Sequence, residues 1–252
     1  VWRGCAGWVA VVIGAASGFG RAAGVRRAVD GADVAVLDVD EAGLAETARR
    51  IEATGRRAAP VRVDLLDRAD IIAAFDAVKR DLGHITILHN NAGGSLRGDI
   101  RTFRRSGPDQ WDYMTTLNLR QAVDCTRQVV NEMVDAGYGR IINTSSEMAF
   151  RTGVAMTDYS AAKAGLLGFT RSLANEVGRY GVTVNAVCPG ATRTTLTANL
   201  GDDRLRQTAS EIPLGRLGEP EEIAHAVSFF ASPGASYVPG EHLLVTGGRT
   251  VH

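Results

Sequence analysis

Near the start of the chain, an apolar stretch runs directly into closely spaced glycines. The segment WVAVVIGAASGFGRAAG contains a β-branched run of strand length, three glycines and an alanine-rich helical pattern. This order predicts a strand, a turn and a helix. Gly14, Gly18 and Gly20 suit a tight turn, a close approach of the backbone to a pyrophosphate, and close helix–strand packing. We expect phosphate groups at the N-terminus of this helix, although the same glycines also fit a simple turn.

The next strand pattern, ADVAVLDVD, ends in a carboxylate. Asp38 lies at the tip of that strand, where it could bind the hydroxyls of an adenosine ribose. Its charge would repel a 2′-phosphate, and neither Ala15 nor Val39 supplies a basic side chain to hold one. Asp38 could instead cap the following helix, although Asp40 is better placed for that role. We predict NAD as the cofactor and consider NADP less favoured.

Helix and strand patterns alternate through the rest of the chain. Helices are expected near 41–54, 67–82, 109–136, from 158 onward and 219–231, and strands at APVRVD, ITILHN, GRIINTSS, GVTVNAV and HLLVTGG. Such alternation predicts a parallel sheet with helices on both faces, whose ligands gather beyond the carboxyl ends of the strands. Asp64 and the NNAG stretch Asn90–Gly93 fall at such ends. Asp64 could reach an adenine amino group or could cap the next helix.

Tyr159 and Lys163, in the stretch YSAAK, share one face of an expected helix. A phenol has a pKa near ~10, so it is a poor base at neutral pH unless a cation stabilises the phenolate. Arginine cannot replace the compact ammonium of lysine, and this chain contains only two lysines. The serine pair Ser145 and Ser146 ends the preceding strand. Asn118 interrupts an apolar helical pattern, where it would pair with a buried polar group or hold a water molecule.

Composition excludes several classes of function. Acidic and basic residues number 28 each, and no long run of like charge suggests nucleic-acid binding or a membrane anchor. Apolar runs are too short to span a bilayer and no signal-peptide pattern is present, so we expect a cytoplasmic protein with a small-molecule substrate. The spacing of the three cysteines and five histidines suits neither a disulfide framework nor a metal site. We expect no catalytic metal.

From about residue 8 to residue 248, the chain resembles the short-chain dehydrogenase/reductase family. The resemblance rests on GAASGFG, NNAG, Asn118, a serine thirteen residues before the tyrosine, YxxxK, and PG followed by a threonine. By this spacing Ser146, rather than Ser145, matches the family's serine. The resemblance implies one Rossmann-type α/β domain over 1–252, with a doubly wound sheet of about seven strands. It also implies a homotetramer built through the long helices near 109–136 and 158–180.

The resemblance further implies hydride transfer between a nicotinamide and a carbinol carbon. Tyr159 would be the general base in oxidation and the general acid in reduction. Lys163 would lower the pKa of the tyrosine and hold the nicotinamide ribose, and Ser146 would orient the substrate oxygen. Asn118 would position a water molecule in the proton relay. These four residues are the expected catalytic set.

The remaining site residues follow from the strand ends and from the same resemblance. The expected cofactor-binding residues are Gly14, Ser17, Gly18, Phe19, Gly20, Asp38, Asp64, Leu65, Asn91, Ala92, Gly93, Tyr159, Lys163, Pro189, Gly190, Thr192 and Thr194. The expected substrate-pocket residues are Gly94, Ser95, Met148, Phe150, Val154 and Met156. A polar segment from about 191 to 215 has the composition of a lid over a pocket.

The substrate is the least constrained feature. An NAD enzyme of this kind suggests oxidation of a cyclic, aromatic or hydroxyacyl secondary alcohol, with direction and stereochemistry open. The arginines at 97–105, Arg151 and Arg193 could bind an anionic substrate or could simply be solvated. One alternative is a 3-oxoacyl-[acyl-carrier-protein] reductase, which would be expected to carry basic residues where Asp135, Gly137 and Tyr180 stand. A more remote alternative is a non-catalytic NAD-binding scaffold.

Overall fold

All strands pair in parallel. The chain adds strands first on one side of its first strand and then on the other. The computed structural model describes residues 7–95, 102–151, 153–194, 197 and 201–251. The strands within these residues are β1 Val9–Ile13, β2 Asp33–Asp38, β3 Ala58–Arg62, β4 Ile87–Asn90, β5 Gly139–Thr144, β6 Val182–Pro189 and β7 His242–Val245. They form one seven-stranded sheet in the order β3-β2-β1-β4-β5-β6-β7. Because β1 pairs with β2 on one side and β4 on the other, a crevice is expected between the ends of β1 and β4.

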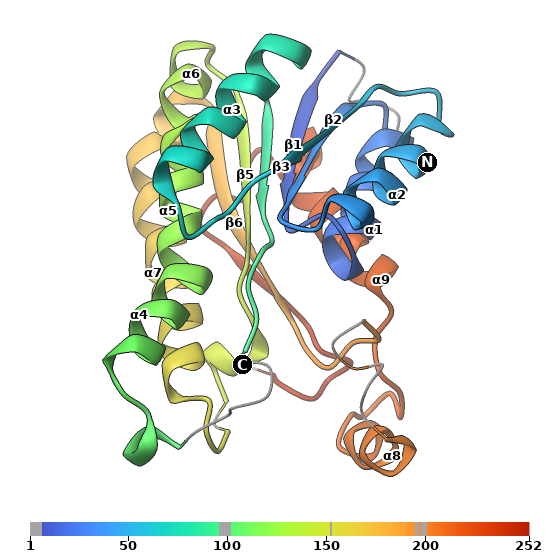
Figure 1. Ribbon diagram of the computed structural model, residues 1–252, viewed down its shortest axis with the longest axis vertical. Coiled ribbons are helices and arrows are strands. Elements are labelled where there is room, and N and C mark those ends of the chain that lie inside the picture. The colour runs from blue at the N-terminus through green and yellow to red at the C-terminus, as the bar shows by residue number, and fades with distance from the viewer. Residues whose placement is uncertain (1–6, 96–101, 152, 195–196, 198–200, 252) are drawn as a thin grey trace.

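Helices cover both faces of this sheet (Figure 1). They are α1 Gly18–Val29, α2 Glu41–Glu52, α3 Arg68–Leu82, α4 Pro108–Thr115, α5 Gln121–Arg127, α6 Val130–Asp135, α7 Thr157–Val177, α8 Asp202–Ser210 and α9 Pro220–Ala231. Short 3₁₀ turns are η1 Phe103–Arg105, η3 Glu147–Ala149, η4 Gly178–Tyr180 and η5 Pro233–Ala235. Helices α1, α2 and α9 lie on one face, and α3 to α7 lie on the other. The predicted single Rossmann-type domain is confirmed.

Successive side chains of β1 point to opposite faces of the sheet, and this explains why the core consists of two apolar clusters, one on each face. Every side chain of β1 is buried. Ala10 and Val12 belong to the apolar cluster shared with α1, α2 and α9, whereas Val11 and Ile13 belong to the cluster shared with α3, α5, α6 and α7. A strand covered on both faces reads as a continuous apolar run, and this is the pattern seen in the sequence.

The single helix predicted at 109–136 is wrong, because the chain there forms several shorter pieces. Helix α4 ends at Thr115, and a π-helical turn, η2 Thr116–Arg120, connects it to α5. A second break separates α5 from α6, where Val129 leaves helical geometry with φ −122°. A π turn holds one more residue than an α turn. The segment therefore departs from regular α-helical geometry around Asn118.

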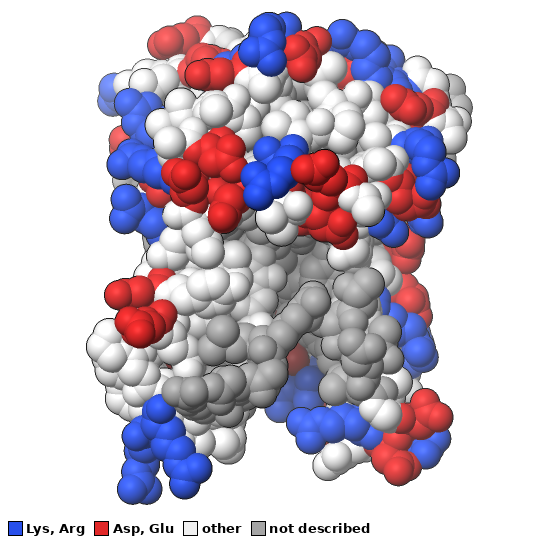
Figure 2. Space-filling view, viewed as in Figure 1, with Lys and Arg blue, Asp and Glu red and all other residues white. Residues whose placement is uncertain are grey.

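Charge is distributed rather than segregated on the surface. Figure 2 shows basic and acidic side chains interspersed on the face in view. Several of them form ion pairs, such as Arg57 with Asp33 and Lys79 with Glu132. Among the described residues, no helix is both long and apolar enough to cross a membrane.

Candidate active site

The loop after β1 is shaped by glycines that no other residue could replace. Gly14 and Gly18 have φ of +75° and +52°. A Cβ at Gly14 would lie 2.8 Å from Cα of Ala92, and one at Gly20 would overlap the carbonyl oxygen of Gly14. Ser17 caps α1 without a side-chain hydrogen bond, and the first turn carries no acidic side chain. Within the described residues, the N–H groups at this helix end thus have no side-chain acceptor, which suits an anionic group such as a pyrophosphate.

Asp38 lies at the end of β2, beside this loop. Its Oδ2 accepts a hydrogen bond from the backbone N–H of Ala16 at 3.0 Å, and Oδ1 accepts from Val39 and Asp40 at 2.8 and 3.2 Å. Asp40 is the residue that caps α2, through the N–H of Gly43. Asp38 therefore does not cap the helix. Since a carboxylate has about four acceptor sites, it can still bind ribose hydroxyls.

Asp64 also does not cap a helix. Asp67 is the N-cap of α3 and accepts from the N–H of Ala69 at 2.8 Å. Asp64 accepts from the N–H of Leu66 at 2.9 Å and lies just beyond the end of β3, next to the half-buried Leu65. Its position beyond the strand is compatible with contact to an adenine.

The NNAG stretch lies between the glycine loop and the predicted catalytic residues. The side-chain amide of Asn91 donates to the carbonyl of Gly14 at 3.1 Å. Gly93 has φ +146°, and a Cβ there would lie 2.7 Å from Oδ1 of Asn118 and 2.9 Å from Nζ of Lys163. The backbone at Gly93 is thus closely enclosed, and only a glycine allows Asn118 and Lys163 to approach it.

Asn118 is fully buried inside the π turn. Its Oδ1 accepts from the N–H of Gly94 at 2.9 Å, while Nδ2 donates to the carbonyls of Gly94 and Met114, both at 3.0 Å. Of the two expectations for this residue, pairing with buried polar groups is the one observed. The side chain fixes the backbone at Gly94 and also donates to a helix carbonyl one turn earlier.

Lys163 is 2% exposed, and its Nζ donates to the carbonyl of Thr144 at 2.8 Å. Burial lowers the pKa of Lys163 to about 8. The ammonium lies 5.8 Å from the centre of the Tyr159 ring. A buried lysine with a lowered pKa beside a tyrosine is the kind of perturbed group that marks functional sites.

Tyr159 has its pKa raised above the ordinary value for a phenol. Burial is the main cause, a hydrogen bond with the hydroxyl of Ser146 acts in the opposite direction, and the negative charge of Glu147 raises the pKa further. Ser145 instead donates to the helix carbonyl of Lys163 at 2.8 Å. Ser146 rather than Ser145 thus interacts with the phenol, which is compatible with its predicted role.

The end of β6 faces the glycine loop. Gly190 lies so close to the last strand turn that a Cβ there would be 2.9 Å from Cα of Thr246. Thr192 donates to the carbonyl of Gly190 at 3.0 Å. Thr194 lies opposite Gly18, 3.5 Å from where a Cβ on that glycine would be. The PG turn that begins at Pro189 thus lies across the crevice from α1.

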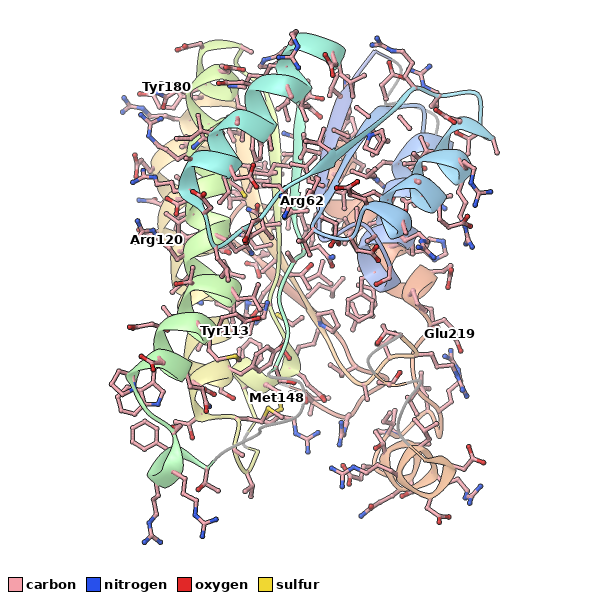
Figure 3. The ribbon with its side chains drawn as sticks, viewed as in Figure 1. Arg62, Tyr113, Arg120, Met148, Tyr180 and Glu219 are labelled. Atoms are coloured by element: carbon pink, nitrogen blue, oxygen red, sulfur yellow. The ribbon has the colours of Figure 1, made fainter. Side chains whose placement is uncertain are left out.

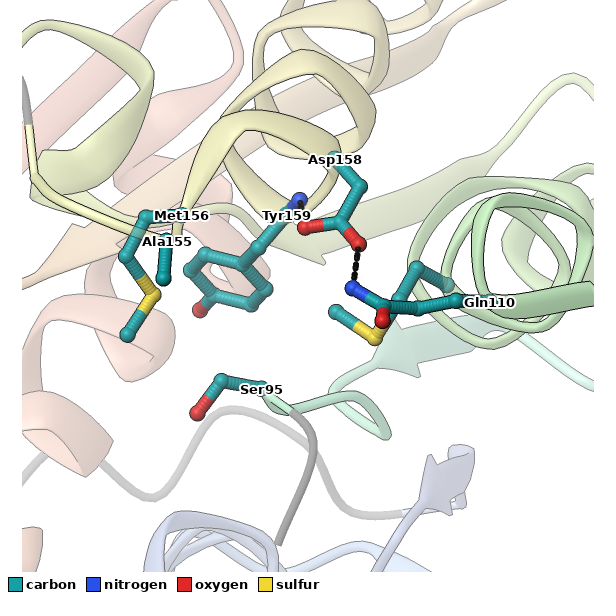
Figure 4. Close-up of a pocket in the computed structure, with 7 residues that line it drawn as sticks. Ser95, Gln110, Ala155, Met156, Asp158 and Tyr159 are labelled. Carbon is teal, nitrogen blue, oxygen red and sulfur yellow. Dashed lines mark hydrogen bonds between the residues drawn. The ribbon is translucent and has the colours of Figure 1, made fainter. Parts of the chain in front are cut away.

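A cavity of about 10 Å³, roughly the size of one water molecule, lies in front of Tyr159 (Figure 4). Its lining residues are Ser95, Gln110, Met114, Ala155, Met156, Asp158 and Tyr159. Gln110 of α4 donates to Asp158 of α7 at 2.6 Å across its edge. Ser95 and Met156 were among the predicted pocket residues, whereas Gln110, Met114 and Asp158 were not.

Comparison with known proteins agrees with this geometry. A family model described as enoyl-(acyl carrier protein) reductase matches residues 14–250. The 3-oxoacyl-[acyl-carrier-protein] reductase FabG of Vibrio harveyi is 39% identical over 242 residues, 96% of this chain and 97% of that protein. The dehydrogenase subunit BbsD of Thauera aromatica, named for a hydroxy(phenyl)methylsuccinyl-CoA, is 36% identical over 96% of each chain. A levodione reductase crystal structure matches with a TM-score of 0.91 at 31% identity, covering 97% of this chain and 98% of its own.

The chain belongs to the short-chain dehydrogenase/reductase family. Members are oxidoreductases that use nicotinamide cofactors and act on CH–OH or keto groups, and this protein is an oxidoreductase of that kind. Its glycine loop, with an uncapped helix end, fits such a cofactor. No cluster of side chains suited to a metal ion occurs in the part of the chain described above.

Other predicted pocket residues of this dehydrogenase/reductase do not line the cavity. Val154 is 88% exposed, and Phe150 stacks on His242. Figure 3 places Met148 at the same end of the molecule as Tyr113 of α4. Within the predicted lid, residues 202–210 form α8, which stands clear of the sheet in Figure 1, while residues 195–196 and 198–200 lie outside the described chain.

Two of the four described arginines proposed as anion ligands form ion pairs. Arg193 pairs with Glu219, and Arg151 pairs with Glu147 and Glu211. Arg97 and Arg101 lie outside the described residues. Arg104 and Arg105 are exposed in η1.

Two charged residues near the site were not foreseen from the sequence. Glu147 directly follows Ser146 and is 5% exposed, and Arg249 pairs with it. For Glu147 a signal existed, because a carboxylate next to a catalytic serine stands at a strand end. For Arg249 no sequence signal existed. Its partner Glu147 lies 102 residues away in sequence, so the pair leaves no local pattern.

Proposed function

We propose that this protein is an NAD-dependent dehydrogenase that transfers a hydride between the nicotinamide and a secondary alcohol or ketone of cyclic, aromatic or hydroxyacyl type. The observation that supports NAD most directly is the carboxylate of Asp38 at the tip of β2, bonded to the backbone of Ala16. A negative charge there favours ribose hydroxyls and repels a 2′-phosphate.

The bound cofactor supplies the hydride chemistry. Tyr159 and the side chains around it carry out the proton transfer. Tyr159 takes the hydroxyl proton in oxidation and returns it in reduction, which contributes roughly 10²–10⁴-fold to the rate. Ser146, whose hydroxyl also interacts with the phenol, orients the substrate oxygen. Lys163 holds the nicotinamide ribose and, as an ammonium, favours the phenolate. The side chain of Asn118 keeps the backbone at Gly93 and Gly94 beside Lys163.

The second candidate is a 3-oxoacyl-[acyl-carrier-protein] reductase. The 39% identity to FabG of Vibrio harveyi over nearly the whole chain favours it. The places where basic residues would be expected hold Asp135, Gly137 and Tyr180. Figure 3 shows Tyr180 at the end of the molecule opposite Met148. These positions could therefore affect only the docking of a carrier protein, not the binding of a substrate in the cavity.

One assay separates these candidates. The protein is offered NAD or NADP with a panel of cyclic and aromatic secondary alcohols, hydroxyacyl thioesters and sugars. We expect turnover with NAD and a secondary alcohol. A clear preference for NADPH with a 3-oxoacyl thioester would instead support the carrier-protein reductase, and NAD binding without any turnover would support the scaffold alternative.

Two further proposals concern the state of the protein. We expect a homotetramer formed through the helical segments near 109–136 and 158–180, in the cytoplasm. Light scattering on the purified protein tests the assembly, and a monomeric mass would contradict it.

A further inference from the structure

A buried carboxylate lies directly beside the predicted catalytic serine. Glu147 begins η3, one residue after Ser146. Its Oε1 lies 2.9 Å from the guanidinium of Arg249 and 3.5 Å from that of Arg151, and its Oε2 accepts from the hydroxyl of Thr250 at 3.1 Å. Three side chains thus converge on one carboxylate, and two of them come from the last turn of the chain.

The two arginines also share a second acid. Arg249 forms a hydrogen-bonded ion pair with Glu211, and Arg151 lies 4.0 Å from the same carboxylate. We call these four residues, Glu147, Arg151, Glu211 and Arg249, the Glu147 cluster. It has two positive and two negative charges, so the buried carboxylate is neutralised by its neighbours. The cluster also connects the serine loop to the segment that follows α8.

The turn that presents Arg249 is held in place by its own bonds. Thr246 donates to the carbonyl of Thr250 at 3.1 Å and accepts from its N–H at 3.3 Å. Gly190 packs under this turn, where a Cβ would lie 2.9 Å from Cα of Thr246 and 3.4 Å from Oε2 of Glu147. Arg249 is correspondingly only 15% exposed. In Figure 1 the C-terminal end lies at the carboxyl ends of the strands, beside the site.

We propose that Arg249 is a positioning residue of the active site, which holds the serine loop and cancels the charge of Glu147 next to Tyr159. The inference rests on the proposed role of Tyr159 as acid and base. Without Arg249, the carboxylate of Glu147 would keep one cationic partner, Arg151 at 3.5 Å, and its negative charge would act on the phenol more strongly.

Other charged groups near the phenol do not change this expectation. Glu147 already raises the pKa of Tyr159, behind burial, and Cys188 of β6 raises it to a smaller extent. Lys163 is bonded to Thr144, and Asp158 is bonded to Gln110. None of these groups contacts Arg249, so its removal changes the charge near Tyr159 chiefly through Glu147.

The test is a comparison of Arg249→Gln with Glu147→Gln. Loss of the arginine should raise the pKa of Tyr159 and loss of the carboxylate should lower it, each by on the order of one pH unit. The double variant should behave like Glu147→Gln, because Arg249 acts on the phenol through Glu147. Arg249→Lys should stay near the parent, and Arg80→Gln, which removes an exposed arginine beside Asp81, is the control for loss of one positive charge.

Two measurements are needed. The first is the pH dependence of kcat/KM for alcohol oxidation, where the alkaline shift in Arg249→Gln should slow the rate at neutral pH about tenfold per unit. The second is NMR titration of ¹³C-labelled tyrosine ζ-carbons, assigned with Tyr159→Phe, which needs no substrate. The proposal is overturned if both single variants shift the tyrosine in the same direction, or neither does, in proteins whose circular dichroism matches the parent. Because the titration is independent of turnover, its result stands whether or not the proposed reaction is found.

Discussion

Asp38 and Glu147 are both carboxylates at or just beyond the carboxyl ends of strands, but they are bonded to different kinds of partner. Asp38 accepts from three backbone N–H groups, those of Ala16, Val39 and Asp40. Glu147 is held by side chains, with two of its partners more than 100 residues away. Backbone dipoles leave the net charge of Asp38 in place for a ligand. Arginines pair with Glu147, and under the proposed role of Arg249 they limit how far its charge raises the pKa of the phenol nearby.

The proposed site therefore has two halves. We call them the cofactor half and the catalytic half, after the residues predicted for each. The cofactor half, β1 with α1 and β2, is built mainly from local backbone and glycine geometry. The catalytic half, β5 with η3 and α7, depends on buried side chains that must meet from distant segments. Substitutions should therefore change ligand preference in the first half and turnover or proton affinity in the second.

The largest effect should come from Tyr159→Phe. Removal of the hydroxyl leaves no proton donor or acceptor at that point, so kcat should fall by at least about 10³-fold. The glycine loop is untouched, and NADH binding, measured by fluorescence titration, should stay within about twofold. Turnover close to the parent rate would show that the catalytic half is wrongly assigned.

Lys163→Arg should also be severely impaired, by on the order of 10²-fold in kcat, although it keeps the charge. A planar guanidinium is larger than the ammonium, and Nζ already lies within 2.9 Å of where a Cβ on Gly93 would be. Steady-state kinetics at saturating cofactor test this, with Lys79→Arg as the matched control. A near-normal rate would mean that only the charge matters in this half.

In the cofactor half, Asp38→Ser should change selectivity rather than chemistry. Loss of the negative charge should shift the NAD to NADP ratio of kcat/KM toward NADP by about tenfold or more, equivalent to about 1.4 kcal/mol. Asp38→Asn keeps the shape and can still accept from Ala16, so it separates charge from loop geometry. A native preference for NADPH would contradict the role assigned to Asp38.

The lowered pKa of Lys163 also predicts a pH dependence of stability. Its pKa falls from 10.5 to about 8 on folding, so between these values the unfolded chain binds a proton that the folded chain has lost. The free energy of unfolding should then rise with pH in this window, by up to about 1.4 kcal/mol per unit. Urea unfolding at pH 7.5 and 9.5 should show this component in the parent but not in Lys163→Met. Lys79→Met, at a lysine paired with Glu132, should behave like the parent.

The smallest effect is expected at a carboxylate with a purely structural role. Asp67 caps α3 through the N–H of Ala69, so Asp67→Ala should reduce the free energy of unfolding by about 1 kcal/mol. Cofactor selectivity and kcat should not change. A shift in NAD affinity would show that this strand end contributes to binding as well as to folding.

The difference between the two halves also explains what the sequence could predict. Glycine spacing, the carboxylate at Asp38 and the alternation of elements are local patterns, and the sheet they predicted is the one observed. Ser146 was expected to face Tyr159 from the spacing of these two residues in the family that the chain resembles. The break at Asn118 was not found, because its polar partner Gly94 lies 24 residues away in sequence. The Glu147 cluster was missed for the same reason.

The π turn at 116–120 has a consequence for how this family member tolerates insertions and deletions. Each residue of an α-helix turns the chain by about 100°, and one additional residue in the turn lets Asn118 face Gly94 while Ala122 and Cys125 remain buried in α5. Deleting one residue here would restore a regular helix without rotating α5, because the wider turn already takes up the additional residue. The loss would fall on Asn118 and its hydrogen bonds to Gly94, while the buried positions of α5 would keep their places.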